Sequence, residues 1–287
     1  MRPFHFGVVV DQNMPWADTL ERFRYAERLG LDSAWVCDHF VQPSRPTYPG
    51  GYLEGWTLLA ALAARTERIR LGVLVSSNTF RHPALLAKQA VTVDHVSNGR
   101  LEIGLGAGWY EPEHVMYGLD FPGPGELVDR YREAVQIVDG LLRHEVLSYQ
   151  GRHYQLHDAT FRPAPLQRPR PPLTLGAHGP RMLRIVAEHA DRWNSFGTVE
   201  EMAKRNDLLD EHCARIGRDA DSIARSLYGW ASMMPRDPFA SVDAFAEMVE
   251  RYRGAGVHEF LVDLPAPTQY PVLERVVSDL VPKLRAG

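Results

Sequence analysis

The chain has 287 residues, of which 45% are hydrophobic and 24% are charged, with a formal net charge of −4. These values exclude wholesale disorder, and the lack of a basic run gives no reason to expect a nucleic-acid partner. No apolar stretch reaches the roughly 18 residues needed to span a bilayer, so no membrane partner is expected. The two cysteines, Cys37 and Cys213, exclude a disulfide framework and match no metal-ligand spacing. We expect a cytoplasmic protein without a metal site, and without a signal peptide because the first strand begins at His5.

Short apolar strands and amphipathic helices alternate along the chain. The expected strands are His5–Val10, Ser33–Val36, Ile69–Val75, Leu101–Leu105, Leu173–Leu175, Arg192–Phe196, Ser226–Ala231 and Glu259–Asp263. The expected helices are Trp16–Leu29, Thr57–Arg65, Pro83–Val96, Glu126–Arg143, Arg181–His189, Val199–Ile216, Val242–Gly254 and Tyr270–Leu284. Alternating βα units imply a parallel sheet, and eight of them predict an α/β fold of the (β/α)8 (TIM) barrel type, formed by residues 1–287 as a single domain.

One segment interrupts this alternation. Residues 144–172 contain a hairpin-like run, Val146–Tyr149 and His153–Leu156, followed by a proline-rich stretch. We interpret the segment as an insertion between strand–helix units four and five, because the alternation resumes directly after it. An open doubly wound sheet is the alternative fold. It requires a glycine fingerprint after the first strand, where this chain has Asp11-Gln12-Asn13-Met14.

A glycine-rich turn follows the fourth strand, in Gly104-Leu105-Gly106-Ala107-Gly108. Glycine allows a positive φ and lets a ligand approach the main chain closely. The spacing is neither a dinucleotide fingerprint nor a P-loop. A tight turn without a ligand is therefore the alternative interpretation.

The active site of a (β/α)8 barrel lies at the C-terminal ends of its strands. Hydroxyls, amides, glycines and aromatic residues follow the strands here, a set that suits a flat heterocycle with a phosphorylated tail. Gly176–Gly179 precede a helix whose free N–H groups could bind a phosphate. Asp38 and His39 follow strand two. A role in catalysis and a purely structural hydrogen bond are the two alternatives for this pair.

Several longer stretches resemble one known family. They are residues 30–40 (GLDSAWVCDHF), 64–72 (ARTERIRLG), 81–88 (RHPALLAK), 94–109 (DHVSNGRLEIGLGAGW), 151–154 (GRHY), 169–172 and 187–194. Together they are similar to the bacterial luciferase-like monooxygenase superfamily, in its coenzyme F420-dependent oxidoreductase branch. The resemblance implies a homodimer that holds F420 at the strand ends, with helices 57–65 and 83–96 as the expected interface.

The resemblance also gives expected roles to individual residues. His39 is the expected catalytic residue, with Asp38 fixing its orientation. It further implies a non-prolyl cis peptide in strand three, near Leu74–Val75. The expected cofactor-binding residues are Leu74, Val75, Ser76, Asn78, Gly106, Ala107, Gly108, Gly176, Ala177, His178 and Gly179. The expected substrate pocket holds Asn13, Phe40, Trp109 and Tyr110.

The resemblance, together with the residues at the strand ends, implies an oxidoreductase that transfers a hydride between F420 and an organic substrate. An FMN-dependent monooxygenase that uses reduced flavin and O2 is the alternative, and a binding protein without activity is a third. The acidic tail of F420 needs basic residues at the pocket mouth, for which Arg45, Arg81 and Arg181 are candidates. The sugar-phosphate dehydrogenases of this family carry a catalytic Glu where this chain has Trp109, which implies a bulkier or more apolar substrate.

Overall fold

The protein is a closed parallel barrel, as the alternation predicts. The computed structural model describes residues 4–43 and 51–286. The strands pair in the order β3-β2-β1-β11-β10-β9-β8-β5-β4, and pairing between β3 and β5 closes the ring. Because β3 and β4 are two parts of one interrupted strand, the barrel has eight strand positions. The strands are β1 (His5–Val9), β2 (Ser33–Val36), β3 (Arg70–Val73), β4 (Ser76–Ser77), β5 (Leu101–Gly106), β8 (Leu173–Gly176), β9 (Arg192–Ser195), β10 (Ala224–Gly229) and β11 (Glu259–Asp263).

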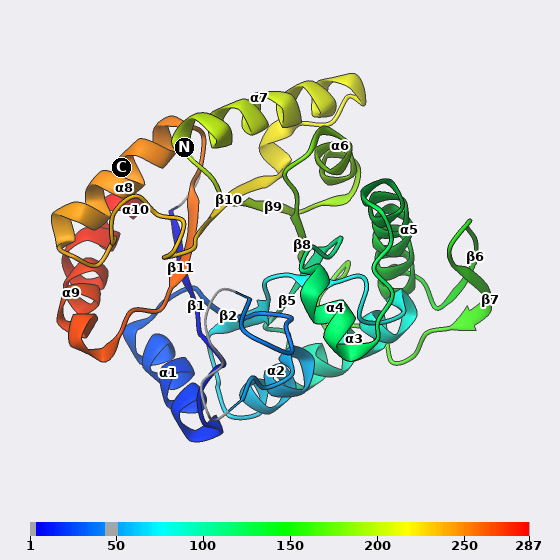
Figure 1. Cartoon of the computed structure of the whole chain (residues 1–287), viewed down its shortest axis with the longest axis horizontal. Helices are drawn as coiled ribbons and strands as arrows, with labels where there is room; N and C mark the ends of the chain where they lie inside the picture. The colour runs from blue at the N-terminus through cyan, green and yellow to red at the C-terminus, as the bar shows by residue number, and fades with distance from the viewer. Residues whose placement is uncertain (1–3, 44–50, 287) are drawn as a thin grey trace.

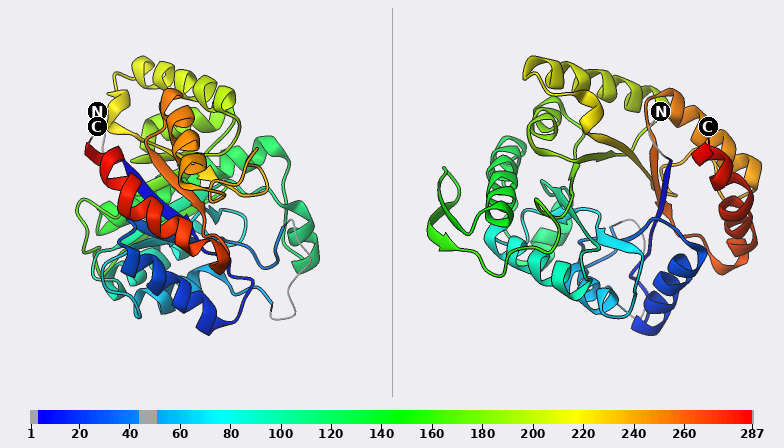
Figure 2. Two further views of the ribbon diagram at one scale, coloured as in Figure 1. Left: turned by 90° about the vertical axis from the view of Figure 1, so that its left-hand side faces the viewer. Right: turned by 180° about the vertical axis from the view of Figure 1, so that it is seen from behind.

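Helices form a ring around the strands (Figures 1 and 2). They are α1 (Trp16–Leu29), α2 (Gly55–Ala63), α3 (Pro83–Val96), α4 (Glu111–Tyr117), α5 (Pro124–Arg143), α6 (Pro180–His189), α7 (Val199–Arg215), α8 (Val242–Gly254), α9 (Tyr270–Arg275) and α10 (Val281–Ala286). A π-helical segment, Val276–Leu280, joins α9 to α10 where the sequence predicts one helix. None of the helices in residues 4–43 and 51–286 has the length and apolarity required to cross a bilayer.

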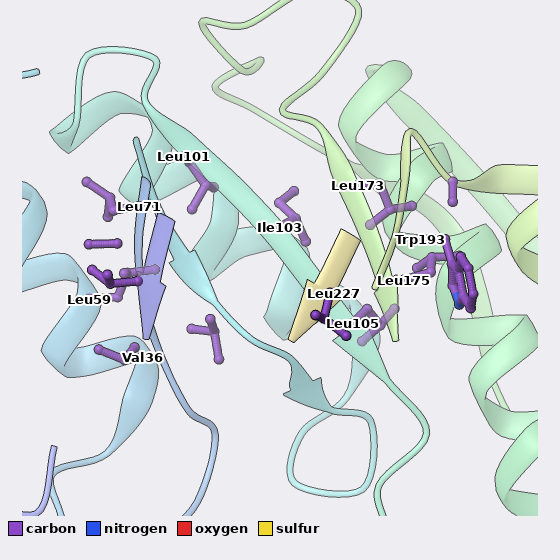
Figure 3. Close-up of a cluster of buried hydrophobic side chains, with 14 of the residues drawn as sticks. Val36, Leu59, Leu71, Leu101, Ile103, Leu105, Leu173, Leu175, Trp193 and Leu227 are labelled. Carbon is purple, nitrogen blue, oxygen red and sulfur yellow. The ribbon is translucent and has the colours of Figure 1, made fainter. Parts of the chain in front are cut away.

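Strand β5 shows why the sequence closes into a barrel. Its side chains alternate between the two faces of the sheet. Leu101, Ile103 and Leu105 are fully buried in the main apolar cluster, which also includes side chains of the surrounding helices (Figure 3). Glu102 points the other way, into the barrel, where it contacts Arg192 of β9, and a Cβ on Gly104 would lie 2.0 Å from the Val73 carbonyl oxygen of β3. The outward-facing side chains of β5 therefore belong to the apolar core between strands and helices, and its inward-facing positions hold a charged residue and a glycine.

The barrel interior holds an ion-pair cluster below the strand ends. Arg192 donates to Glu102 Oε2 from Nη1 at 2.5 Å and pairs with Glu259. Arg70 also pairs with Glu102. Burial alone would raise the pKa of Glu102, and the charges of Arg192 and Arg70 more than offset this, so its pKa is lowered. The four side chains satisfy one another in the interior.

The insertion is where the sequence places it, between α5 and β8. It forms a two-stranded antiparallel sheet of β6 (Val146–Gln150) and β7 (Gln155–Thr160). This hairpin projects beside α5, outside the ring of helices (Figure 1). Helix α4 was not predicted, because its apolar residues Val115, Met116 and Tyr117 are all exposed and carry no core-facing pattern.

Candidate active site

A cavity of about 700 Å³ opens at the C-terminal ends of the strands. Residues from the loops after β1, β2, β5, β8, β9, β10 and β11 line it, together with the β3–β4 junction. Most of the predicted site residues meet there. They are Asp38, His39, Leu74, Val75, Gly106, Ala107, Gly108, Trp109, Tyr110, Gly176 and His178.

The His39 ring is held by a buried carboxylate on α4. His39 Nδ1 lies 2.8 Å from Glu113 Oε2, and the Glu113 side chain is fully buried. The other oxygen, Oε1, accepts the backbone N–H groups of Phe40 and Val41. Burial acts to raise the pKa of Glu113, but these hydrogen bonds and His39 outweigh it, so the pKa is lowered. An ionised carboxylate only accepts, so Nδ1 carries the proton and Nε2 of the neutral ring is left as an acceptor.

Asp38 does not orient His39, so that expectation is wrong. The Asp38 carboxylate forms a two-point ion pair with Arg81, at 2.5 and 2.9 Å, and accepts the backbone N–H of Ser77 at 2.7 Å. Arg81 also donates to Glu54, which caps α2. Asp38 therefore joins the end of β2 to β4 and to the segment before α3. The His39 side chain points away from Asp38 and contacts Glu113 on α4.

Val75 forms a projection at the break between β3 and β4. The Leu74–Val75 peptide bond is cis, as the resemblance predicts. A Cβ on Gly106 would lie 2.6 Å from Val75 Cγ2, and one on Gly176 would lie 2.9 Å from the same atom. The glycines of β5 and β8 thus make room for Val75. From the sequence we expected the glycines at the ends of β5 and β8 to make room for a ligand; the structure shows that they make room for the Val75 side chain.

Gly108 has a different reason for being glycine. Its φ is +91°, and a Cβ would lie 2.8 Å from Thr79 Oγ1 and 2.9 Å from Ser77 Oγ. Thr79 in turn contacts His114 Nε2 at 2.6 Å, while His114 Nδ1 lies 2.9 Å from the Tyr110 carbonyl. This chain of contacts fixes the loop between β5 and α4 over the strand ends.

The part of the cavity after β8 has a cradle for an anion. Helix α6 begins after Gly179 with no side-chain cap, so its first N–H groups have no side-chain acceptor. His178 lines the cavity just before it, with Nδ1 2.8 Å from Ser195 Oγ. Burial, with a smaller effect from Arg205, lowers the pKa of His178 to about 4. A neutral imidazole and free N–H groups suit a phosphate group.

Other predicted site residues stabilise the walls and do not line the cavity. Asn13 donates to Gln42 at 2.7 Å, and Ser76 accepts the Trp56 indole N–H at 3.0 Å. The Phe40 ring packs on Phe80 and Tyr117, Asn78 donates to Tyr154, the Ala177 carbonyl accepts the Trp193 indole, and Gly179 is the residue before α6.

The basic residues predicted at the mouth are not gathered there. Arg81 is buried against Asp38, and Arg181 pairs with Asp129 on α5 at 2.6 Å on the surface. Arg45 lies outside the described residues. Among the residues that the structure describes, Arg22 is the one Arg or Lys that lines the cavity.

Sequence reasoning missed residues that line the β10 and β11 side. Trp230 directly follows β10, and it was missed because the expected strand, Ser226–Ala231, extends past it. The Tyr228 hydroxyl donates to Asp263 at 2.8 Å, and burial raises the pKa of Tyr228 well above its usual value. Glu113 gave no usable signal, because its role depends on a helix that lacks an apolar pattern.

Comparison with known sequences identifies curated relatives. The chain is 34% identical over 205 residues to an F420-dependent glucose-6-phosphate dehydrogenase of Microbacterium testaceum, covering 69% of this chain and 59% of the relative. It is 32% identical over 231 residues to a phthiodiolone/phenolphthiodiolone dimycocerosates ketoreductase of a Mycobacterium species, covering 73% of this chain and 60% of the relative. The chain thus spans about 60% of the length of these relatives.

Solved structures share the fold over almost the whole chain. An F420-dependent secondary alcohol dehydrogenase in complex with an F420-acetone adduct superposes with a TM-score of 0.82 at 19% identity, covering 96% of this chain and 98% of the other. The F420-dependent tetrahydromethanopterin reductase of Methanopyrus kandleri gives the same score and identity, covering 99% and 100%. The sequence profile of the luciferase-like monooxygenase family matches residues 1–260. The chain belongs to the luciferase-like monooxygenase family.

Proposed function

We propose that this protein is an F420-dependent oxidoreductase that moves a hydride between the deazaflavin and an organic substrate. The observation that carries the proposal is the cavity itself. It joins an apolar projection at Val75 to an anion cradle at α6 and to the His39–Glu113 pair. The relatives named as F420-dependent support the choice of cofactor.

The residues present fit the proposed cofactor. Val75, seated on Gly106 and Gly176, offers an apolar support for one face of a flat ring. The uncapped start of α6 and the neutral His178 suit the phosphate of its tail. F420, when bound, supplies a ring carbon that donates or accepts a hydride.

His39 is the proposed proton carrier. Glu113 holds Nδ1, so Nε2 is the nitrogen that exchanges a proton with the substrate. When the substrate gains a hydride, His39 gives a proton to the atom that gains the electron pair. In the reverse direction, Nε2 accepts it. Glu113 stabilises the imidazolium in both directions because it is ionised and buried beside Nδ1.

The test is titration with F420 and, separately, with FMN, followed by intrinsic tryptophan fluorescence. Trp109 and Trp230 line the cavity and will report on ring binding. We expect saturable quenching by F420 at concentrations at least about tenfold below those needed for FMN. Tighter binding of FMN would favour the monooxygenase alternative. An assay of O2 consumption in the presence of reduced FMN would then test that activity.

We also propose a cytoplasmic homodimer that associates through α2 and α3. Helix α3 exposes Leu85 and Val96, at 53% and 44% of their full area. The two cysteines are unpaired, which suits a reducing compartment. Light scattering at micromolar concentration should give twice the chain mass, and Leu85→Glu should give the monomer mass. A wild-type monomer would contradict the proposal.

A further inference from the structure

We propose that the half of the cavity over β1, β10 and β11 binds an uncharged organic molecule with a flat apolar body, and disfavours phosphorylated substrates. The inference rests on the proposed function and adds the substrate class to it. Four features of this half carry it: its place in the barrel, its charge, its aromatic lining and its apolar floor.

The strand order separates two ends of the cavity. In the ring β3-β2-β1-β11-β10-β9-β8-β5, strand β8 lies four positions from β1. The anion cradle that follows β8 therefore lies opposite Asp11, which follows β1. Likewise, the glycines of β5 lie opposite Asp263 at the end of β11. A cofactor phosphate at α6 leaves the β1, β10 and β11 side for the substrate.

That side has a net negative lining. Asp11, Asp237 and Asp263 line it, and Arg22 of α1, the single Arg or Lys among the described lining residues, offsets one of their charges. The acidic groups are hydrogen-bonded within the protein: Asp11 accepts from Asn13 N at 2.9 Å, and Asp263 accepts from Ala231 N at 2.9 Å. These carboxylates therefore repel an anionic ligand, and their existing hydrogen bonds mean that they do not require a cationic ligand. A phosphate dianion would meet like charges in a partly enclosed space.

Tyr228 and Trp230, at the end of β10, line the same side, and Trp230 contacts aromatic rings from the loops after β5 and β9. Trp230 is central: its ring lies 6.3 Å from Trp109, 6.0 Å from Phe196 and 6.3 Å from Tyr228, with which it is stacked at an interplanar angle of 5°. Trp109 remains 58% exposed, so it can still cover a ligand face. Such rings bind flat apolar molecules through stacking and burial of apolar area.

The floor beneath them carries no charge. Val9, Trp35, Leu74 and Leu261 form a separate small apolar cluster inside the barrel. Cys37 packs against it, and burial together with Asp263 and Asp11 raises its thiol pKa to about 12, so the thiol is neutral. A buried apolar floor, an aromatic cover and an acidic rim together select an uncharged, flat substrate such as an aryl ketone or its alcohol. Reduction of the ketone would place a hydride from the reduced deazaflavin on the carbonyl carbon and a proton from His39 on its oxygen, and the proton that the deazaflavin also loses would restore His39.

The experiment compares two probes with the same ring. Isothermal titration calorimetry on the purified protein saturated with oxidised F420, which occupies the anion cradle at α6, measures binding of 2-acetylnaphthalene and of 2-naphthyl phosphate. We expect the ketone to bind at least about tenfold more tightly than the phosphate. Asp11→Asn should narrow this ratio about two- to fivefold, because it removes one of the repelling charges. Trp230→Ala should weaken the ketone about tenfold, and Trp16→Ala, an exposed tryptophan outside the cavity lining, should change neither value.

The outcomes separate this inference from the proposed function. Equal or tighter binding of 2-naphthyl phosphate, or saturable binding of glucose 6-phosphate in preference to the ketone, would overturn the substrate class. No binding of the ketone to a protein that still binds F420 would do the same and leave the oxidoreductase proposal standing. Failure to bind F420 alongside normal ketone binding would overturn the function but not the pocket. Circular dichroism of each variant confirms that it is folded.

Discussion

His39 Nδ1 lies 2.8 Å from the buried carboxylate of Glu113, a residue on a helix that follows a different strand. The pair joins the end of β2 to helix α4, so the His39 ring is oriented by tertiary structure and not by its sequence neighbour Asp38. Asp38 is committed to Arg81 instead. The catalytic unit that we propose is therefore His39–Glu113.

Glu113→Gln tests the positioning role of the carboxylate. The amide cannot stabilise the imidazolium, so kcat should fall about 10- to 100-fold while KM changes little. Glu111→Gln, which changes an exposed carboxylate on the same helix, should leave kcat and KM unchanged. An unchanged kcat, or a rise in KM that accounts for the whole loss of activity, would contradict the positioning role.

His39→Ala tests proton transfer itself. Loss of a general acid–base typically costs about 10²–10⁴-fold in rate, and we expect kcat to fall within that range. F420 affinity, measured by tryptophan fluorescence, should stay within about threefold because the cradle at α6 is untouched. His157→Ala, exposed on the hairpin, is the matched control. Unchanged turnover would assign the proton to another donor, such as Tyr110, His178 or solvent.

The barrel could be predicted from the sequence because each strand and helix is determined by residues close to one another in the chain. The outward residues of β5 repeat every second position, and Gly30, with φ +74°, ends α1 directly after the expected helix Trp16–Leu29. The partners across the site could not be predicted in this way. Glu113 meets His39 across 74 positions, and Val75 meets Gly106 and Gly176 through strand neighbours, so these contacts depend on ring closure and register.

Gly106→Ala tests the support under the proposed cofactor ring. Its Cβ would lie 2.6 Å from Val75 Cγ2, so Val75, the proposed support of the ring, must shift. F420 affinity should fall about tenfold or more. The double variant Gly106→Ala, Val75→Ala removes the clash and should recover part of the affinity. Gly125→Ala, where a Cβ meets nothing within 4 Å, is the control. Equal losses in the single and double variants would show that the clash is not the cause.

Glu102→Gln tests the ion pairs inside the barrel. Removing one charge from a buried network costs on the order of 3 kcal/mol of unfolding free energy at pH 7. The lowered pKa of Glu102 means that this stabilisation is complete above the unfolded-state pKa and is lost as pH falls through the folded-state pKa. The gap between wild type and variant, measured by urea unfolding, should therefore shrink toward pH 3. Glu211→Gln breaks an exposed pair with Arg215 and should cost at most about 0.5 kcal/mol.

Cys37 should resist alkylation although it lines the cavity. Burial is the main reason that its pKa is raised to about 12, and the nearby Asp263 and Asp11 add to it. At pH 8 only about one thiol in ten thousand is then ionised, and the thiolate is the reactive form. Iodoacetamide at pH 8 should leave the native protein unmodified by intact-mass spectrometry, whereas protein unfolded in guanidinium should gain two adducts, at Cys37 and Cys213. Rapid labelling of Cys37 in the native state would show that the thiol is ionised, and it would remove the uncharged floor on which the substrate class depends.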